Sequence, residues 1–147
     1  MTENVVSAIA MQTALAHLSG KQVAKAIRTI GTSFIINFEP LERVPRRRGR
    51  NHWLGGYMRG RTYFLAEGCD WRIERYPRML SAFSAPASQV AAAFGHLEGQ
   101  RLTSARLRGR NNSVTLSFSE GNAIVALPGN DGSWWIGSRT GTISVYE

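Results

Sequence analysis

The chain of 147 residues, with 43% hydrophobic and 19% charged residues, has the length and composition of one folded domain and not of a disordered tail. Its single cysteine, Cys69, excludes a disulfide framework and a cysteine-rich zinc site. The net charge of +8 is local, because seven arginines and no acidic residue lie between Arg43 and Arg61, whereas 11 basic and 10 acidic residues lie outside that window.

The N-terminal sequence gives no sign of export. It lacks the basic segment of a secretory signal, and no apolar run has membrane-spanning length. We therefore expect a soluble, cytoplasmic protein that has no membrane partner.

The first half of the chain predicts a helix followed by strands. Apolar residues fall near one face of residues 4–18 at helical spacing, namely Val5, Ala8, Met11, Leu15 and Leu18. Gly20 suits the position just past a helix end, where a positive φ is favourable. Residues 21–38 predict two strands, because apolar and other residues alternate over 33–38 in the second of them.

The strand pattern then breaks off and resumes at residues 62–66. Residues 39–61 are therefore predicted to be an insertion into a hairpin. Pro45, Gly49, Gly55, Gly56 and Gly60 argue against regular structure for most of it. A loop of this length in a compact domain is usually functional or disordered. Residues 71–74 predict the strand that closes the first half.

The second half predicts the same order of elements. Ser84-Ala85-Pro86 is expected to begin a helix, with Ser84 as its cap, and Gly99 to end it. Five short strands separated by Gly and Asn turns follow, at 102–107, 113–118, 123–127, 133–136 and 142–146. The short turns predict antiparallel pairing.

Three sequence blocks recur in the same order. Ala-Leu-Ala-His-Leu-Ser-Gly at 14–20 returns as Ala-Phe-Gly-His-Leu-Glu-Gly at 93–99, the strand at 33–38 returns at 113–118, and Trp-Arg-Ile at 71–73 returns as Trp-Trp-Ile at 134–136. These blocks predict one α+β domain over 1–147, built from two repeats at about 4–80 and 84–147. The repeats would form two packed sheets or one continuous curved sheet.

Catalytic signals are sparse, so we do not expect an enzyme, a cofactor or a metal site. His17, His52 and His96 are far apart in sequence, and His17 and His96 stand at helix ends, where they are expected to be structural. Asp70 next to Cys69 would raise the pKa of the thiol, which disfavours a nucleophile. An enzyme that uses Cys69 or a histidine is the third alternative, after the two binding functions considered below.

Tryptophans recur at the predicted closing strands. Trp71 and one of Trp134 and Trp135 are expected in the core, because neighbouring strand residues point to opposite faces. The other tryptophan of the pair would face outward, where large aromatic residues are enriched at contact surfaces.

The segment from 43 to 61 supplies the candidate binding residues. They are Arg43, Arg46, Arg47, Arg48, Arg50, His52, Trp53, Tyr57, Arg59 and Arg61. Arginine favours planar, bidentate contact with carboxylate or phosphate, and Trp53 and Tyr57 could stack on bases. The segment therefore predicts contact with an acidic protein surface or with nucleic acid, unless it is a solvated loop with no partner.

The repeated Leu-x-Gly, alternating strand and Trp-x-Ile blocks resemble a group of small bacterial β-rich proteins of unassigned function. Some of these are encoded beside polymorphic toxins and are suspected immunity proteins. The resemblance implies a non-enzymatic, immunity-type inhibitor that blocks a protein partner, such as a cognate toxin. The Arg-rich insertion is not part of that pattern. A nucleic-acid-binding protein that uses the same basic loop is the alternative.

Overall fold

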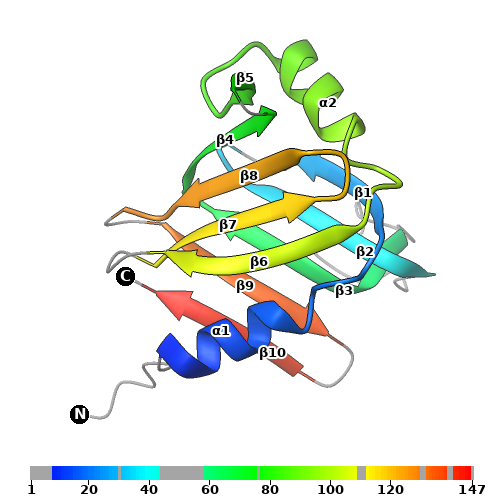
Figure 1. Cartoon of the computed structure of the whole chain (residues 1–147), viewed down its shortest axis with the longest axis vertical. Coiled ribbons are helices and arrows are strands. Elements are labelled where there is room, and N and C mark those ends of the chain that lie inside the picture. The colour runs from blue at the N-terminus through cyan, green and yellow to red at the C-terminus, as the bar shows by residue number, and fades with distance from the viewer. Residues whose placement is uncertain are drawn as a thin grey trace, which may run out of the picture.

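The computed structural model describes residues 8–29, 31–43, 58–75, 77–108, 112–129, 132–138 and 141–146, which form helices and strands in an α+β arrangement (Figure 1). In chain order these elements are α1 (Ala8–Ala16), β1 (Val23–Arg28), β2 (Phe34–Arg43), β3 (Met58–Glu67), β4 (Asp70–Arg75), β5 (Arg78–Ala82), α2 (Ala87–Gly95), β6 (Leu102–Arg108), β7 (Ser113–Phe118), β8 (Asn122–Leu127), β9 (Ser133–Ser138) and β10 (Gly141–Tyr146).

The strands form two five-stranded sheets. Sheet 1 has the order β1-β2-β3-β9-β10 and sheet 2 has the order β5-β4-β8-β7-β6, with antiparallel pairing throughout. The predicted α+β class with antiparallel sheets is therefore confirmed. Each sheet takes three strands from one half of the chain and two from the other, an exchange that the sequence did not predict.

The two sheets share one topology when sheet 1 is followed from β1 and sheet 2 from β6. Sheet 1 then reads β1-β2-β3 followed by β9-β10, and sheet 2 reads β6-β7-β8 followed by β4-β5. In each sheet, three consecutive strands from one half of the chain are followed by two strands from the other half. Both first pairs also contain a register shift, between Val23 and Lys25 in β1 and between Leu102 and Ser104 in β6. A matched position in one sheet can therefore be assigned to each paired position in the other.

The segments that follow the two helices run antiparallel beside each other. Gln22 forms an antiparallel bridge with Arg101, which lies 79 positions later in the chain. The amide of Gly20 donates to the carbonyl of Leu102 (2.7 Å), and the amide of Gly99 donates to the carbonyl of Val23 (2.8 Å). Both glycines have a positive φ, as predicted for Gly20. The predicted helix ends need correction, because α1 ends at Ala16 and α2 at Gly95, each four residues before the glycine.

The helices lie at opposite ends of the pair of sheets and cover their edge strands (Figure 1). On α1, Gln12 donates from Nε2 to the carbonyl of Ala105 (3.0 Å) and accepts from the amide of Leu107 (2.9 Å), both on β6. After α2, a carboxylate oxygen of Glu98 accepts from the amide of Ala26 on β1 (3.1 Å). These bonds satisfy backbone groups that an uncovered edge strand would present to another chain.

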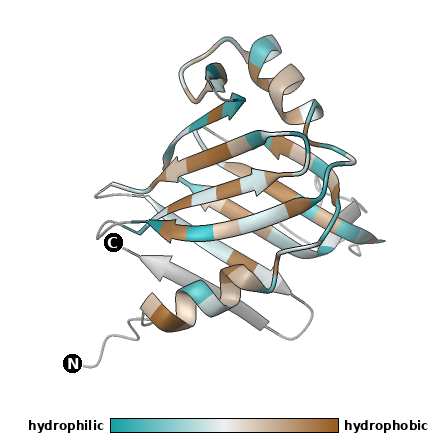
Figure 2. Ribbon diagram, viewed as in Figure 1, coloured by the Kyte–Doolittle hydropathy of each residue, from teal (hydrophilic) through white to brown (hydrophobic). Residues whose placement is uncertain are grey.

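A single apolar core fills the space between the sheets. Along the central strands, buried and partly exposed residues alternate, so that one face of each sheet packs into the core. Figure 2 shows the apolar residues that these strands contribute. Phe34 of β2 contacts Phe64 of β3 in its own sheet, Trp71 of β4 in the other sheet, and Phe94 of α2. Trp134 of β9 stacks on Phe64 (ring centroids 5.7 Å apart), so both halves contribute to the same core.

Three local predictions need correction. The sequence analysis missed β5, because Arg78–Ala82 shows no alternation over so short a run. Pro86, rather than Ser84, is the residue before α2, and no side chain caps this helix. Residues 39–43 and 58–61 of the predicted insertion continue β2 and β3 instead of forming a loop.

Replacing Gly95 by alanine is expected to stabilise the fold. Gly95 is the last residue of α2, and a Cβ built there has no neighbour within 4 Å. Alanine would raise the free energy of unfolding by about 0.5–1 kcal/mol, because it reduces the freedom of the unfolded chain. Urea denaturation measures the change. The control is Gly99→Ala, where the φ of 87° makes alanine destabilising; equal effects of both variants would contradict the prediction.

Candidate partner-binding arm

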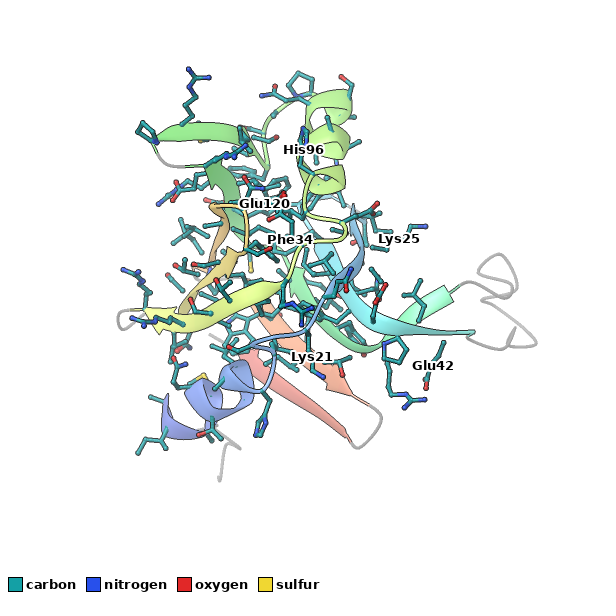
Figure 3. The ribbon with its side chains drawn as sticks, turned by 45° about the vertical axis from the view of Figure 1, so that its right-hand side comes forward. Lys21, Lys25, Phe34, Glu42, His96 and Glu120 are labelled. Atoms are coloured by element: carbon teal, nitrogen blue, oxygen red, sulfur yellow. The ribbon has the colours of Figure 1, made fainter. Side chains whose placement is uncertain are left out.

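We call the predicted insertion, residues 39–61, the basic arm. Its described residues, 39–43 and 58–61, form a two-stranded ribbon. Phe38 is the last residue of β2 paired with β1, and Tyr63 is the first residue of β3 paired with β9. Beyond them β2 and β3 pair only with each other, through Leu41, Glu42 and Arg43 on one strand. Figure 3 shows this ribbon extending away from the two sheets, with Glu42 on it and Phe34 inside the core.

Close backbone packing fixes the point where the arm leaves the sheet. The register between β2 and β3 shifts between Phe38 and Leu41. At this shift the amide of Gly60 donates to Oδ1 of Asn37 (2.9 Å), a side chain that is only 4% exposed. A Cβ built on Gly60 would lie 2.6–2.7 Å from backbone atoms of Phe38 and Thr62, so only glycine fits there.

The structure describes three of the predicted binding residues. Arg43 ends β2, and Arg59 pairs with Glu42 in the ribbon. The exposed guanidinium of Arg61 donates from Nε to the carboxylate of Glu42. Part of the charge at the base of the arm is thus balanced within the chain. The other predicted residues lie outside the described part, namely Arg46, Arg47, Arg48, Arg50, His52, Trp53 and Tyr57.

The three described tryptophans lie where the alternation predicts. Trp71 and Trp134 are buried, with 2% and 0% of their surface exposed, and Trp135 lies half-buried on the outer face of sheet 1. Each buried indole donates to a backbone carbonyl, Trp71 to Thr32 (2.7 Å) and Trp134 to Asn112 (3.0 Å). Trp71 and Trp134 are therefore core residues, and Trp135 is the candidate contact residue of the adjacent pair.

The environment of Cys69 does not favour a nucleophile. Its side chain is buried, and Sγ lies 3.4 Å from the carbonyl of Ser133. Burial raises the pKa of the thiol to about 11, and the negative charge of Asp70 adds to this rise. His17 and His96 lie exposed at the ends of α1 and α2, so neither is buried beside the thiol. His52 is outside the described residues.

Alkylation of Cys69 is expected to be slow. The raised pKa leaves little thiolate near neutral pH, so iodoacetamide should react at least tenfold more slowly with the native chain than with the chain in guanidinium. Because the folded state favours the protonated thiol, this group contributes stability below pH 9, and that contribution is lost as the pH rises towards 11. Rapid modification of the native chain at pH 7 would contradict this environment.

Other site types are not seen in the part of the chain that the structure describes. Among residues 8–29, 31–43, 58–75, 77–108, 112–129, 132–138 and 141–146, no three His, Cys, Asp or Glu side chains come together as a metal site. Neither described helix has the length and apolar character needed to cross a membrane.

No family model, curated protein or solved structure matches the chain significantly.

Proposed function

We propose that this chain is a non-enzymatic binding protein, and specifically an immunity-type inhibitor that blocks an acidic protein partner through its basic arm. The observation that supports the proposal is the ribbon formed by β2 and β3, which extends away from the two sheets (Figure 3) and includes Arg43, Arg59 and Arg61. The segment from Arg43 to Arg61 contains seven arginines and no acidic residue. Such an arm speeds association with an acidic surface and selects for it.

A protein partner is favoured over nucleic acid by the charge at the base of the arm. The ribbon also carries Glu39 and Glu42, and Glu42 already pairs with Arg61. These carboxylates would repel phosphates that lay along the ribbon, whereas a protein surface can offer both signs of charge. The proposal places an acidic patch of the partner against the end of the arm.

Nucleic acid is the second candidate, because the arm combines arginines with Trp53 and Tyr57 in a segment flanked by paired strands. A two-stranded ribbon can enter the major groove of DNA, and aromatic residues can stack on unpaired bases. Binding of this kind would weaken steeply with salt.

Mobility-shift assays with duplex DNA, single-stranded DNA and RNA at 50 and 150 mM salt separate the two candidates. We expect no mobility shift at micromolar protein. In a separate capture experiment, we expect the full chain to retain an acidic protein from the cells that express it. That protein should be lost from the variant Arg46→Ser, Arg47→Ser, Arg48→Ser, Arg50→Ser. A micromolar shift with a steep salt slope that this variant abolishes would instead establish nucleic-acid binding.

We also propose that residues of about 4–80 and 84–147 are copies of one unit. The support is the recurrence of three sequence blocks and the pairing of Gln22 with Arg101, which each lie two residues after the first block of their half. On this proposal the exchange of strands between the sheets joins the two copies around one core.

A further inference from the structure

The outer face of sheet 1 carries an apolar row that crosses four strands. Ile27 of β1 pairs with Ile35 of β2, Ile35 with Leu65 of β3, and Leu65 with Trp135 of β9. Their sequence neighbours point into the core, so these four side chains point away from it. Ile27 is 40% exposed and the other three are half-buried. We call Ile27, Ile35, Leu65 and Trp135 the outer row.

Sheet 2 provides an internal control for this row. At the matched positions Arg106 of β6 pairs with Thr115 of β7, Thr115 with Val125 of β8, and Val125 with Arg72 of β4. The same topology therefore tolerates two arginines and a threonine where sheet 1 has two isoleucines and a tryptophan. An antiparallel sheet normally has a polar outer face. The fold does not require the apolar character of the outer row, and contact with a partner explains it.

The outer row lies close to the basic arm on the same two strands. Ile35 and Leu65 belong to β2 and β3, which continue directly into the arm. At about 3.3 Å per residue, the row lies within roughly 30 Å of Arg43 along β2. An interface of ordinary size buries about 800 Å² on each partner, which corresponds to a patch of similar width. One partner can therefore contact both the row and the arm.

The net charge of the chain and the arginines of the arm indicate the kind of partner, because the row itself is bordered by both signs of charge, exposed Lys25 on β1 and exposed Glu67 on β3. Exposed Lys25 lies two residues before Ile27 and pairs with Asn37, so it lies on the side of the row towards the base of the arm. A second copy of this chain would bring another net charge of +8 and a second arginine-rich arm. An acidic protein has the complementary charge.

We propose that the outer row is the apolar centre of the partner interface, and that it docks an apolar strip bordered by carboxylates on the acidic protein that the arm attracts. This inference rests on the proposed function. It adds a specific surface, in which the arm supplies charge and the row supplies buried apolar contact. A few buried apolar and aromatic side chains near the centre of an interface usually carry most of its affinity.

Photo-cross-linking in the full chain tests the surface. The photoreactive residue p-benzoylphenylalanine replaces Arg46 in the arm, Leu65 in the row or Thr115 on sheet 2, and cross-linked products from the cells of origin are identified by mass spectrometry. We expect the same acidic protein from positions 46 and 65 and none from position 115. A product of twice the chain's mass from position 65 would make the row a self-interface and overturn the inference.

A matched pair of variants then tests whether the row contributes to binding. Ile27→Arg with Ile35→Thr introduces the residues found at the matched positions of sheet 2, and Arg106→Ala with Thr115→Ser is the control. Capture from position 46 should fall at least tenfold in the first variant and stay unchanged in the control, while both keep the native circular dichroism spectrum.

The outcomes separate this inference from the proposed function. The inference would be overturned if the row variant left capture from position 46 unchanged and position 65 captured no protein. The arm would then remain as the contact. If position 46 captures no protein, the proposed function fails and the inference fails with it.

Discussion

Trp71→Ala is expected to lower the free energy of unfolding by about 3–5 kcal/mol, as is typical when a large buried aromatic side chain is truncated. The Trp71 ring packs against Phe34 and Phe94, with ring centroids 5.7 and 5.1 Å apart, and its indole donates to the carbonyl of Thr32. Since small domains have a total stability of about 5–15 kcal/mol, this one change should remove a large share of it. Urea denaturation followed by circular dichroism measures the loss.

Trp71→Phe is the control, because phenylalanine keeps an aromatic ring but cannot donate to the carbonyl of Thr32. We expect it to cost about 1–3 kcal/mol, less than the alanine variant, from the smaller ring and the unpaired carbonyl. Trp134→Ala should cost as much as Trp71→Ala, since Trp134 is equally buried and also donates to a backbone carbonyl. A loss below 1 kcal/mol for both alanine variants would contradict the shared core.

Gly60→Ala is expected to destabilise the chain by about 2–4 kcal/mol and to disturb the base of the arm. The added Cβ would meet only backbone atoms, which cannot rotate away, and the movement would break the bond from the Gly60 amide to Asn37. Overpacking and a buried polar group without a partner each cost about 1–3 kcal/mol. Chemical denaturation gives the loss, and hydrogen exchange along β2 and β3 shows where it occurs.

Gly137→Ala is the matched control for Gly60→Ala. Its built Cβ lies 2.0–2.4 Å from the Tyr63 ring, but a side chain can change rotamer where backbone cannot. We therefore expect a smaller loss, and amide exchange at the base of the arm should remain as in the parent chain. If Gly60→Ala proved as stable as the parent, the close approach of β3 to Phe38 would be wrong.

Local patterns predicted most strands, but they did not predict which strands share a sheet. The alternation over 33–38 and 113–118 marks β2 and β7 because one face of each is buried. Alternation does not specify a partner beyond the next turn, so the pairing of β3 with β9 and of β4 with β8 could not be deduced. That pairing depends on contacts between residues far apart in the chain.

The candidate site was predicted in part. The cluster of arginines identified the arm, but glycines and a proline concealed the strands at its base, where Gly60 is needed for close packing and not for a turn. The outer row was missed as a unit. The alternation over 33–38 placed Ile35 on the face opposite the core, and Trp135 was one of two alternatives, but Ile27 and Leu65 resemble ordinary core residues in sequence. Only the register of the strands shows that they align on one outer face.

The role of the basic arm is tested most directly by the association rate constant of the acidic protein captured from position 46. We expect the rate constant to fall at least tenfold at 50 mM salt in the variant Arg46→Ser, Arg47→Ser, Arg48→Ser, Arg50→Ser, and the difference from the parent chain to shrink at 500 mM salt, where charges are screened. Equal rate constants for the two chains at low salt would contradict the proposal that the arm selects the partner by charge.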